Sequence, residues 1–130
     1  MQDYQMGVIE SKFADIIWDN EPISSTELVK ICEKEFNWKK STTYTVLKRL
    51  SNKGLFISNN GIVTSLISKE ELQSVQSHNF VRETFQGSLP AFLTAFTSRN
   101  ALTKEEVAYL KRLVNEYEEE WLWKIYFFKF

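Results

Sequence analysis

The sequence predicts a mainly α-helical protein that carries one β-hairpin. In most of the chain, apolar residues recur three and four positions apart, which is the spacing of amphipathic helices. Residues 55–67 differ, because two short runs rich in β-branched and aromatic residues flank Asn59-Asn60-Gly61. An Asn-Gly pair between two such runs is typical of a tight type I′ hairpin turn. We therefore predict three helices, then a hairpin, then three more helices.

The first three helices are predicted at residues 6–18, 24–36 and 41–53. Asn20-Glu21-Pro22 ends the first helix, and the capping box Ser24-x-x-Glu27 begins the second. Residues 37–40 connect the second helix to the third, which makes a helix-turn-helix. With the hairpin directly after it, this order predicts a winged helix-turn-helix DNA-binding domain at residues 1–67. The same elements also fit an unrelated small α+β domain.

The predicted third helix has two distinct faces. One face is mostly apolar and consists of Thr43, Val46, Leu47 and Leu50. The other carries hydroxyls, an amide and a cation, on Ser41, Tyr44, Thr45, Lys48 and Asn52. Residues 39–53 hold no carboxylate but five cations, which are Lys39, Lys40, Lys48, Arg49 and Lys53. Such groups contact base edges and phosphates, so we expect this helix to lie in a DNA major groove. The alternative is an amphipathic helix with a solvated basic side.

Residues 68–130 are predicted to form a three-helix dimerisation domain. Its helices begin at Ser68-x-x-Glu71, at Ser88 and at Thr103-x-x-Glu106. The last helix carries apolar residues spaced alternately three and four apart, which is a heptad seam. We expect this seam to pack against a second copy of the chain, and packing on the chain's own winged domain is the alternative. The predicted interface residues are Leu89, Phe92, Leu93, Phe96, Val107, Leu110, Val114, Tyr117 and Trp121.

The last ten residues, 121–130, form an unusually aromatic segment, Trp-Leu-Trp-Lys-Ile-Tyr-Phe-Phe-Lys-Phe, which we call the aromatic segment. Left in water, it would favour aggregation. We expect it to complete the dimer core, and a membrane-surface anchor is the alternative.

Composition excludes several kinds of chemistry. The 130-residue chain has a net charge of −1, one cysteine and one histidine. A single Cys32 excludes a disulfide framework and a cysteine-cluster zinc site, and Cys32 and His78 fall in different predicted halves. We find no glycine-rich phosphate loop, signal peptide or membrane-spanning stretch. We therefore expect a cytoplasmic protein without enzyme activity, catalytic residue, metal, cofactor or small-molecule substrate.

Several motifs together resemble the penicillinase-repressor family of bacterial winged-helix regulators, which includes methicillin-resistance and copper-responsive repressors. The resemblance covers about residues 7–118. It is carried by Ala14-Asp15-Ile16-Ile17-Trp18-Asp19, by residues 41–50 with Lys53-Gly54, by Phe85-Gln86-Gly87-Ser88-Leu89-Pro90-Ala91-Phe92, and by Leu102-Thr103-Lys104-Glu105-Glu106.

The resemblance implies a transcriptional repressor that binds a palindromic operator as a homodimer. It implies base-facing roles for Ser41, Thr42, Tyr44 and Thr45, with Lys48 beside them. The basic residues Lys39 and Lys40 precede this set. For Arg49 two roles stay open, a contact to phosphate or an ion pair with an acid inside the domain.

The sequence departs from the family pattern in three places. The predicted wing, Ser58-Asn59-Asn60-Gly61, has no cation, so any contacts to DNA would be amide or backbone hydrogen bonds and non-specific affinity should be lower. The C-terminal part has no cysteine, which excludes copper sensing by the family's cysteine motif. The β-lactam-responsive members are cleaved at an Asn-Phe bond and partner a membrane sensor protease, whereas Ala95-Phe96 stands at that position here. A winged-helix module that binds proteins rather than DNA is the remaining alternative.

Overall fold

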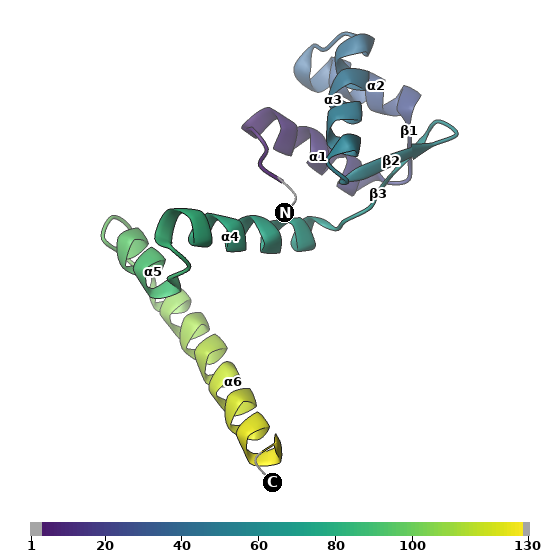
Figure 1. Ribbon diagram of the computed structural model, residues 1–130. Coiled ribbons are helices and arrows are strands. Elements are labelled where there is room, and N and C mark those ends of the chain that lie inside the picture. The colour runs from purple at the N-terminus through teal and green to yellow at the C-terminus, as the bar shows by residue number, and fades with distance from the viewer. Residues whose placement is uncertain (1–3, 129–130) are drawn as a thin grey trace. The chain divides into compact units, whose positions relative to one another are not determined.

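A computed structural model of the chain (Figure 1) describes the backbone of residues 4–128 and the side chains of residues 4–124. Helices predominate, as predicted. The elements are α1 (Val8–Asn20), β1 (Ile23–Ser24), α2 (Ser25–Phe36), α3 (Lys40–Asn52), β2 (Phe56–Asn59), β3 (Ile62–Ser65), α4 (Lys69–Phe85), α5 (Leu89–Thr97) and α6 (Lys104–Phe128). The order of α1 to α3 followed by a hairpin confirms the winged helix-turn-helix.

The hairpin forms around the predicted turn. Asn60 and Gly61 have φ values of 52° and 77°, and two successive positive φ values define a type I′ turn. The sequence did not predict β1, which pairs with β3 and makes a three-stranded antiparallel sheet of order β1-β3-β2. The Glu21 carboxylate holds β3 against the end of α1, because it accepts hydrogen bonds from the Ser65 N–H at 2.9 Å and the Ser65 hydroxyl at 2.8 Å.

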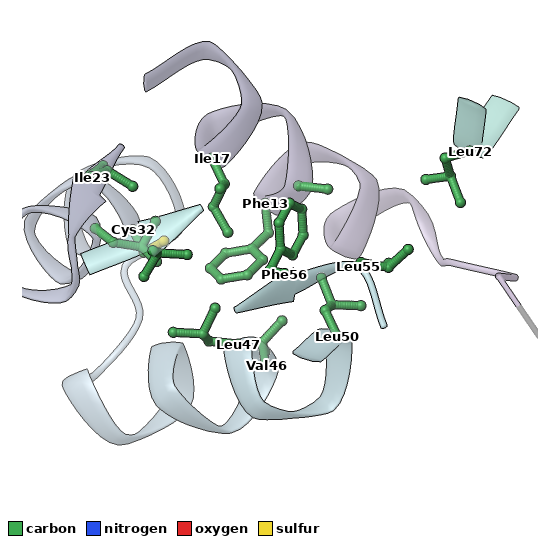
Figure 2. Packing of buried hydrophobic residues seen from close by; sticks show 13 residues of the cluster. Phe13, Ile17, Ile23, Cys32, Val46, Leu47, Leu50, Leu55, Phe56 and Leu72 are labelled. Carbon is green, nitrogen blue, oxygen red and sulfur yellow. The ribbon is translucent and has the colours of Figure 1, made fainter. Parts of the chain in front are cut away.

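Buried side chains from α1, α2, α3 and the hairpin form one core (Figure 2). Phe13 and Ile17 of α1 and Phe56 of β2 are almost fully buried there. The Trp18 ring lies 5.5 Å from the ring of Phe56, and its Nε1–H donates to the carbonyl of Ile67 at 3.1 Å. This core fixes α3 and the hairpin relative to each other.

The first helix begins two residues later than predicted. Gly7 is extended (φ −71°, ψ 172°) and precedes the first helical residue, while Met6 packs against the core instead of continuing the helix. Ile9, which the helical spacing places on the buried face, is 48% exposed, and Ala14 is buried instead.

The chain forms two compact units, Met1–Gly87 and Ser88–Phe130. The first contains α1 to α4 and the sheet, and the second contains α5 and α6. Helix α4 joins the first unit because Leu72 is buried in its core. From the sequence we placed the functional boundary before Ser68, so the compact unit extends past that boundary by the length of α4.

Candidate nucleic-acid interface

Helix α3 buries one face and exposes the other, as its sequence predicts. Thr43, Val46, Leu47 and Leu50 are between 0% and 6% exposed. The opposite residues are all exposed, and they are Ser41, Thr42, Tyr44, Thr45, Lys48 and Asn52. Burial of the apolar face fixes the rotation of the helix, so the polar groups point into solvent as one surface.

The N-terminus of α3 carries positive charge and lacks a side-chain cap. Lys39 occupies the N-cap position without a capping hydrogen bond, and the first turn holds no acid. A helix N-terminus already bears a partial positive charge, so Lys39 and Lys40 are unfavourable there for folding. The Lys40 ammonium lies 5.8 Å from the centre of the Tyr44 ring, within cation–π range. The charges and the exposed N–H groups together attract an anion to this end of the helix.

Arg49 pairs with an acid inside the domain. Its Nη1 lies 3.7 Å from Oε2 of Glu10 on α1, and the two side chains are 52% and 21% exposed. Farther along, Lys53 donates from Nζ to the carbonyl of Gln5 at 2.9 Å. Of the cations between residues 39 and 53, Lys39, Lys40 and Lys48 therefore have neither an acidic partner nor a hydrogen bond to a carbonyl in the described part of the chain.

Tyr44 is positioned next to the wing through a residue that the sequence did not single out. Its hydroxyl donates to Oγ of Ser25 at a long distance of 3.4 Å. The Ser25 N–H in turn donates to the carbonyl of Gly61, in the wing turn, at 2.8 Å. The start of α2, the exposed face of α3 and the tip of the hairpin therefore lie together. No local sequence pattern marks Ser25, because its contacts come from distant positions.

The wing is exposed and uncharged, in agreement with its sequence. Ser58, Asn59 and Asn60 are all exposed. On the face away from the core, Ile57 and Ile62 are each 42% exposed. The wing therefore offers amide, hydroxyl and backbone groups for hydrogen bonding but no charge for phosphate.

The second unit leaves most of the predicted dimer residues exposed. Val107, Val114, Tyr117 and Trp121 of α6 are 36%, 62%, 68% and 64% exposed. A groove of about 410 Å³ between α5 and α6 is lined by Phe92, Leu93, Phe96, Leu102, Glu105, Glu106, Tyr109 and Leu110. Leu89 is 56% exposed on α5. The start of α6 is fixed by a complete capping box, because Thr103 and Glu106 each donate a backbone N–H to the other's side chain.

The remaining titratable candidates do not assemble a reactive site. Cys32 is fully buried, and burial raises the pKa of its thiol. The Thr43 hydroxyl lies beside the thiol and opposes that rise, although the contact is too loose to count as a hydrogen bond. His78 is exposed on α4. The described side chains include no group of three or more His, Cys, Asp or Glu residues placed to hold a metal ion. No helix among the described residues is long and apolar enough to cross a membrane.

Comparison with known proteins identifies the family. The family model described as penicillinase repressor matches residues 6–116. The chain belongs to the penicillinase-repressor family. It is 25% identical over 118 residues to the penicillinase repressor of Bacillus licheniformis, which covers 88% of this chain and 92% of the relative. Methicillin resistance regulatory protein MecI of Staphylococcus aureus strain Mu50 is also 25% identical over 118 residues, with 87% and 95% covered.

Family membership confirms the resemblance seen in the motifs. Penicillinase-repressor proteins are transcriptional repressors and not enzymes, which accounts for the lack of assembled catalytic groups among the described residues. Ala95-Phe96, which the resemblance in the sequence aligns with the cleavage bond of the β-lactam-responsive members, lies within α5, where Phe96 is 45% exposed.

Proposed function

We propose that this protein represses transcription by binding a palindromic operator as a homodimer, with α3 of each protomer in the major groove. The observation that carries the proposal is the exposed face of α3, which presents hydroxyls, and cations without an acidic partner among the described residues, over a buried apolar face. Membership in a family of repressors supports it.

The exposed groups divide into two roles. Ser41, Thr42, Tyr44 and Thr45 would contact base edges, because they occupy the first turns of α3, the part of a recognition helix that reaches the bases. Lys39, Lys40 and Lys48 would contact phosphates, since they flank this set and have no acidic partner in the described structure. We assign Arg49 a structural role rather than a phosphate contact, because its guanidinium lies at ion-pair distance, 3.7 Å, from the Glu10 carboxylate.

Homodimer formation through α5 and α6 is part of the proposal. The exposed residues of the heptad seam would be covered by the same residues of a second copy, as expected for a two-fold symmetric interface. Dimerisation also matters for affinity. With an uncharged wing, one protomer has few phosphate contacts, and joining two protomers makes the second binding event intramolecular.

Selection of binding sites from a random DNA library tests the proposal. The full chain should enrich an inverted repeat, and footprinting should protect two half-sites spaced by about one helical turn or a multiple of it. A Lys39→Glu/Lys48→Glu variant should enrich nothing. The matched control Lys12→Glu/Arg99→Glu carries the same change in charge away from α3 and from the proposed dimer seam, and it should enrich the same repeat. Enrichment of no sequence by the wild-type chain, or protection of a single half-site, would contradict the proposal.

The apolar outer face of the wing favours one other function, a module that binds proteins. The strand register puts Ile57 opposite Thr64 and Ile62 opposite Asn59, and the two isoleucines are each 42% exposed. If protein binding through this face is the function, Ile57→Ser/Ile62→Ser should abolish the activity of the protein, and Lys39→Glu/Lys48→Glu should leave that activity unchanged. The reverse result supports operator binding.

A further inference from the structure

Tyr44, which we assign to base reading, has a contact at each end of its side chain. The Lys40 ammonium, one turn earlier on α3, lies 5.8 Å from the centre of the ring. The hydroxyl donates to Oγ of Ser25, on α2, at 3.4 Å. Tyr44 is 37% exposed, so much of its side chain lies against the protein instead of extending freely into water.

The position of Ser25 is set by elements other than α3. Ser25 is the first residue of α2, and the start of that helix is fixed by the Ser24 cap, whose Oγ accepts a hydrogen bond from the Glu27 N–H at 3.1 Å. The Ser25 N–H donates to the carbonyl of Gly61, in the wing turn, at 2.8 Å. A Cβ atom added at Gly61 would lie 3.9 Å from Oγ of Ser25, so the turn also lies beside the hydroxyl.

The orientation of Tyr44 matters because contacts to base edges depend on geometry. A tyrosine on an exposed helix face rotates among staggered conformations when nothing holds it. Fixing such a side chain only at the moment of binding lowers the affinity that its contacts would otherwise give. Lys40 is a flexible chain on the same helix, whereas Ser25 is anchored to α2 and to the wing. Ser25 is therefore the contact that can set the direction of the Tyr44 ring before DNA binds.

We propose that Ser25 is a positioning residue for base reading, which holds the Tyr44 ring in one orientation by accepting a hydrogen bond from its hydroxyl. This inference rests on the proposed operator binding and names a determinant of its sequence specificity. Ser25 acts through Tyr44 and not through a contact of its own to DNA. Because Ser25 is also bonded to Gly61, a displacement of the wing turn would displace the Tyr44 hydroxyl, so the uncharged wing influences base reading.

A double-mutant cycle in operator binding tests the proposal. Ser25→Ala removes the hydroxyl but keeps the backbone N–H that bonds to Gly61, and Tyr44→Phe removes the other partner of the side-chain hydrogen bond. The measured quantity is the specificity ratio, which is the Kd for random DNA divided by the Kd for the selected operator. Ser25→Ala should lower this ratio about threefold per half-site and about tenfold for a dimer, the scale of a weak hydrogen bond. In the Tyr44→Phe background, Ser25→Ala should cause no further loss.

Two matched variants control for other effects of removing a hydroxyl. Thr26→Ala removes an exposed hydroxyl from the residue next to Ser25 and should keep the wild-type specificity ratio. Ser68→Ala removes the cap of α4, whose Oγ accepts from the Glu71 N–H at 3.0 Å. This variant should lower the melting temperature and leave the ratio unchanged. A loss of specificity in Ser68→Ala as large as that in Ser25→Ala would reduce the Ser25 effect to one of stability, and the proposal would be wrong.

The cycle also separates this proposal from operator binding itself. The proposal is wrong if Ser25→Ala leaves the specificity ratio at its wild-type value, or if its loss persists in the Tyr44→Phe background, and operator binding stands in both cases. Equal losses of affinity for operator and random DNA in Ser25→Ala would show that the Ser25 hydroxyl contacts phosphate, which also overturns the positioning role. A specificity ratio near one for the wild-type chain would instead contradict the proposed function, and the role of Ser25 would fall with it.

Discussion

Replacing Lys48 by alanine should reduce the salt dependence of operator binding by a calculable amount. Each phosphate that a cation neutralises on duplex DNA contributes about −0.9 to the slope of log K against log salt concentration. Each protomer presents Lys39, Lys40 and Lys48 with neither an acidic partner nor a hydrogen bond to a carbonyl in the described part of the chain, so a dimer presents six such cations. If all six contact phosphate, the slope is about −5.

Removing Lys48 from both protomers leaves four contacts and a slope of about −3.5. Between about 50 and 200 mM salt, affinity should then fall about a hundredfold for the variant, against about a thousandfold for the wild type. Arg49→Ala should leave the slope unchanged, because Arg49 is held by Glu10. The two variants therefore separate a cation that contacts phosphate from one that contributes to the fold.

Fluorescence anisotropy of a labelled operator at a series of salt concentrations measures both slopes. Lys12→Ala, on the exposed surface of α1, controls for the general loss of positive charge and should keep the wild-type slope. A Lys48→Ala slope equal to that of the wild type would refute the phosphate contact. An Arg49→Ala slope reduced as much as that of Lys48→Ala would show that the Glu10 pair opens on DNA.

Three further predictions concern base reading, assembly and the core. Tyr44→Ala should weaken binding to the selected operator by about 1–3 kcal/mol and leave binding to random DNA nearly unchanged. Anisotropy titrations of both DNAs measure the two effects. Equal losses on both DNAs would show that Tyr44 does not contact a base. Val114→Asp/Tyr117→Asp should convert the dimer to monomers in sedimentation equilibrium, because it buries charge in the seam, and a persisting dimer would place the interface elsewhere. Phe56→Ala should lower the free energy of unfolding, measured in urea, by about 3–5 kcal/mol because it leaves a cavity in the core. Ile57→Ala on the exposed face should change that free energy by about 0.5 kcal/mol or less. Similar losses for the two variants would contradict the strand register.

Features that depend on neighbouring residues were predictable from the sequence. The two faces of α3 follow from helical spacing, and burial of Thr43 together with exposure of Tyr44 agrees with it. The Asn60-Gly61 turn follows from residues that tolerate positive φ. The Ser68 cap of α4 is confirmed by the hydrogen bond from the Glu71 N–H to Oγ of Ser68. Each of these features is decided within one or two turns of the chain.

Features that depend on distant residues were not predictable. Strand β1 is two residues long and exists because β3 pairs with it, so no local pattern marks it. The role of Arg49 stayed open because its partner, Glu10, lies on another helix. Likewise, the link from Tyr44 through Ser25 to the wing joins three elements that only the fold brings together. Whether α4 belongs with the winged unit depended on contacts to distant residues, such as the burial of Leu72 in that core and the ion pair of Lys69 with Asp15.

At the uncapped start of α3, the residue that would be best for folding differs from the residue that would be best for DNA binding. The position is Lys39, the N-cap residue. Serine or aspartate in place of Lys39 would supply the missing cap and stabilise the helix by about 1 kcal/mol. The same replacement would remove a charge that we assign to phosphate binding. A screen that rewards heat resistance should therefore accumulate Lys39 variants that fold better and repress less. Engineering a more stable form of this protein should leave this position unchanged and improve other sites instead.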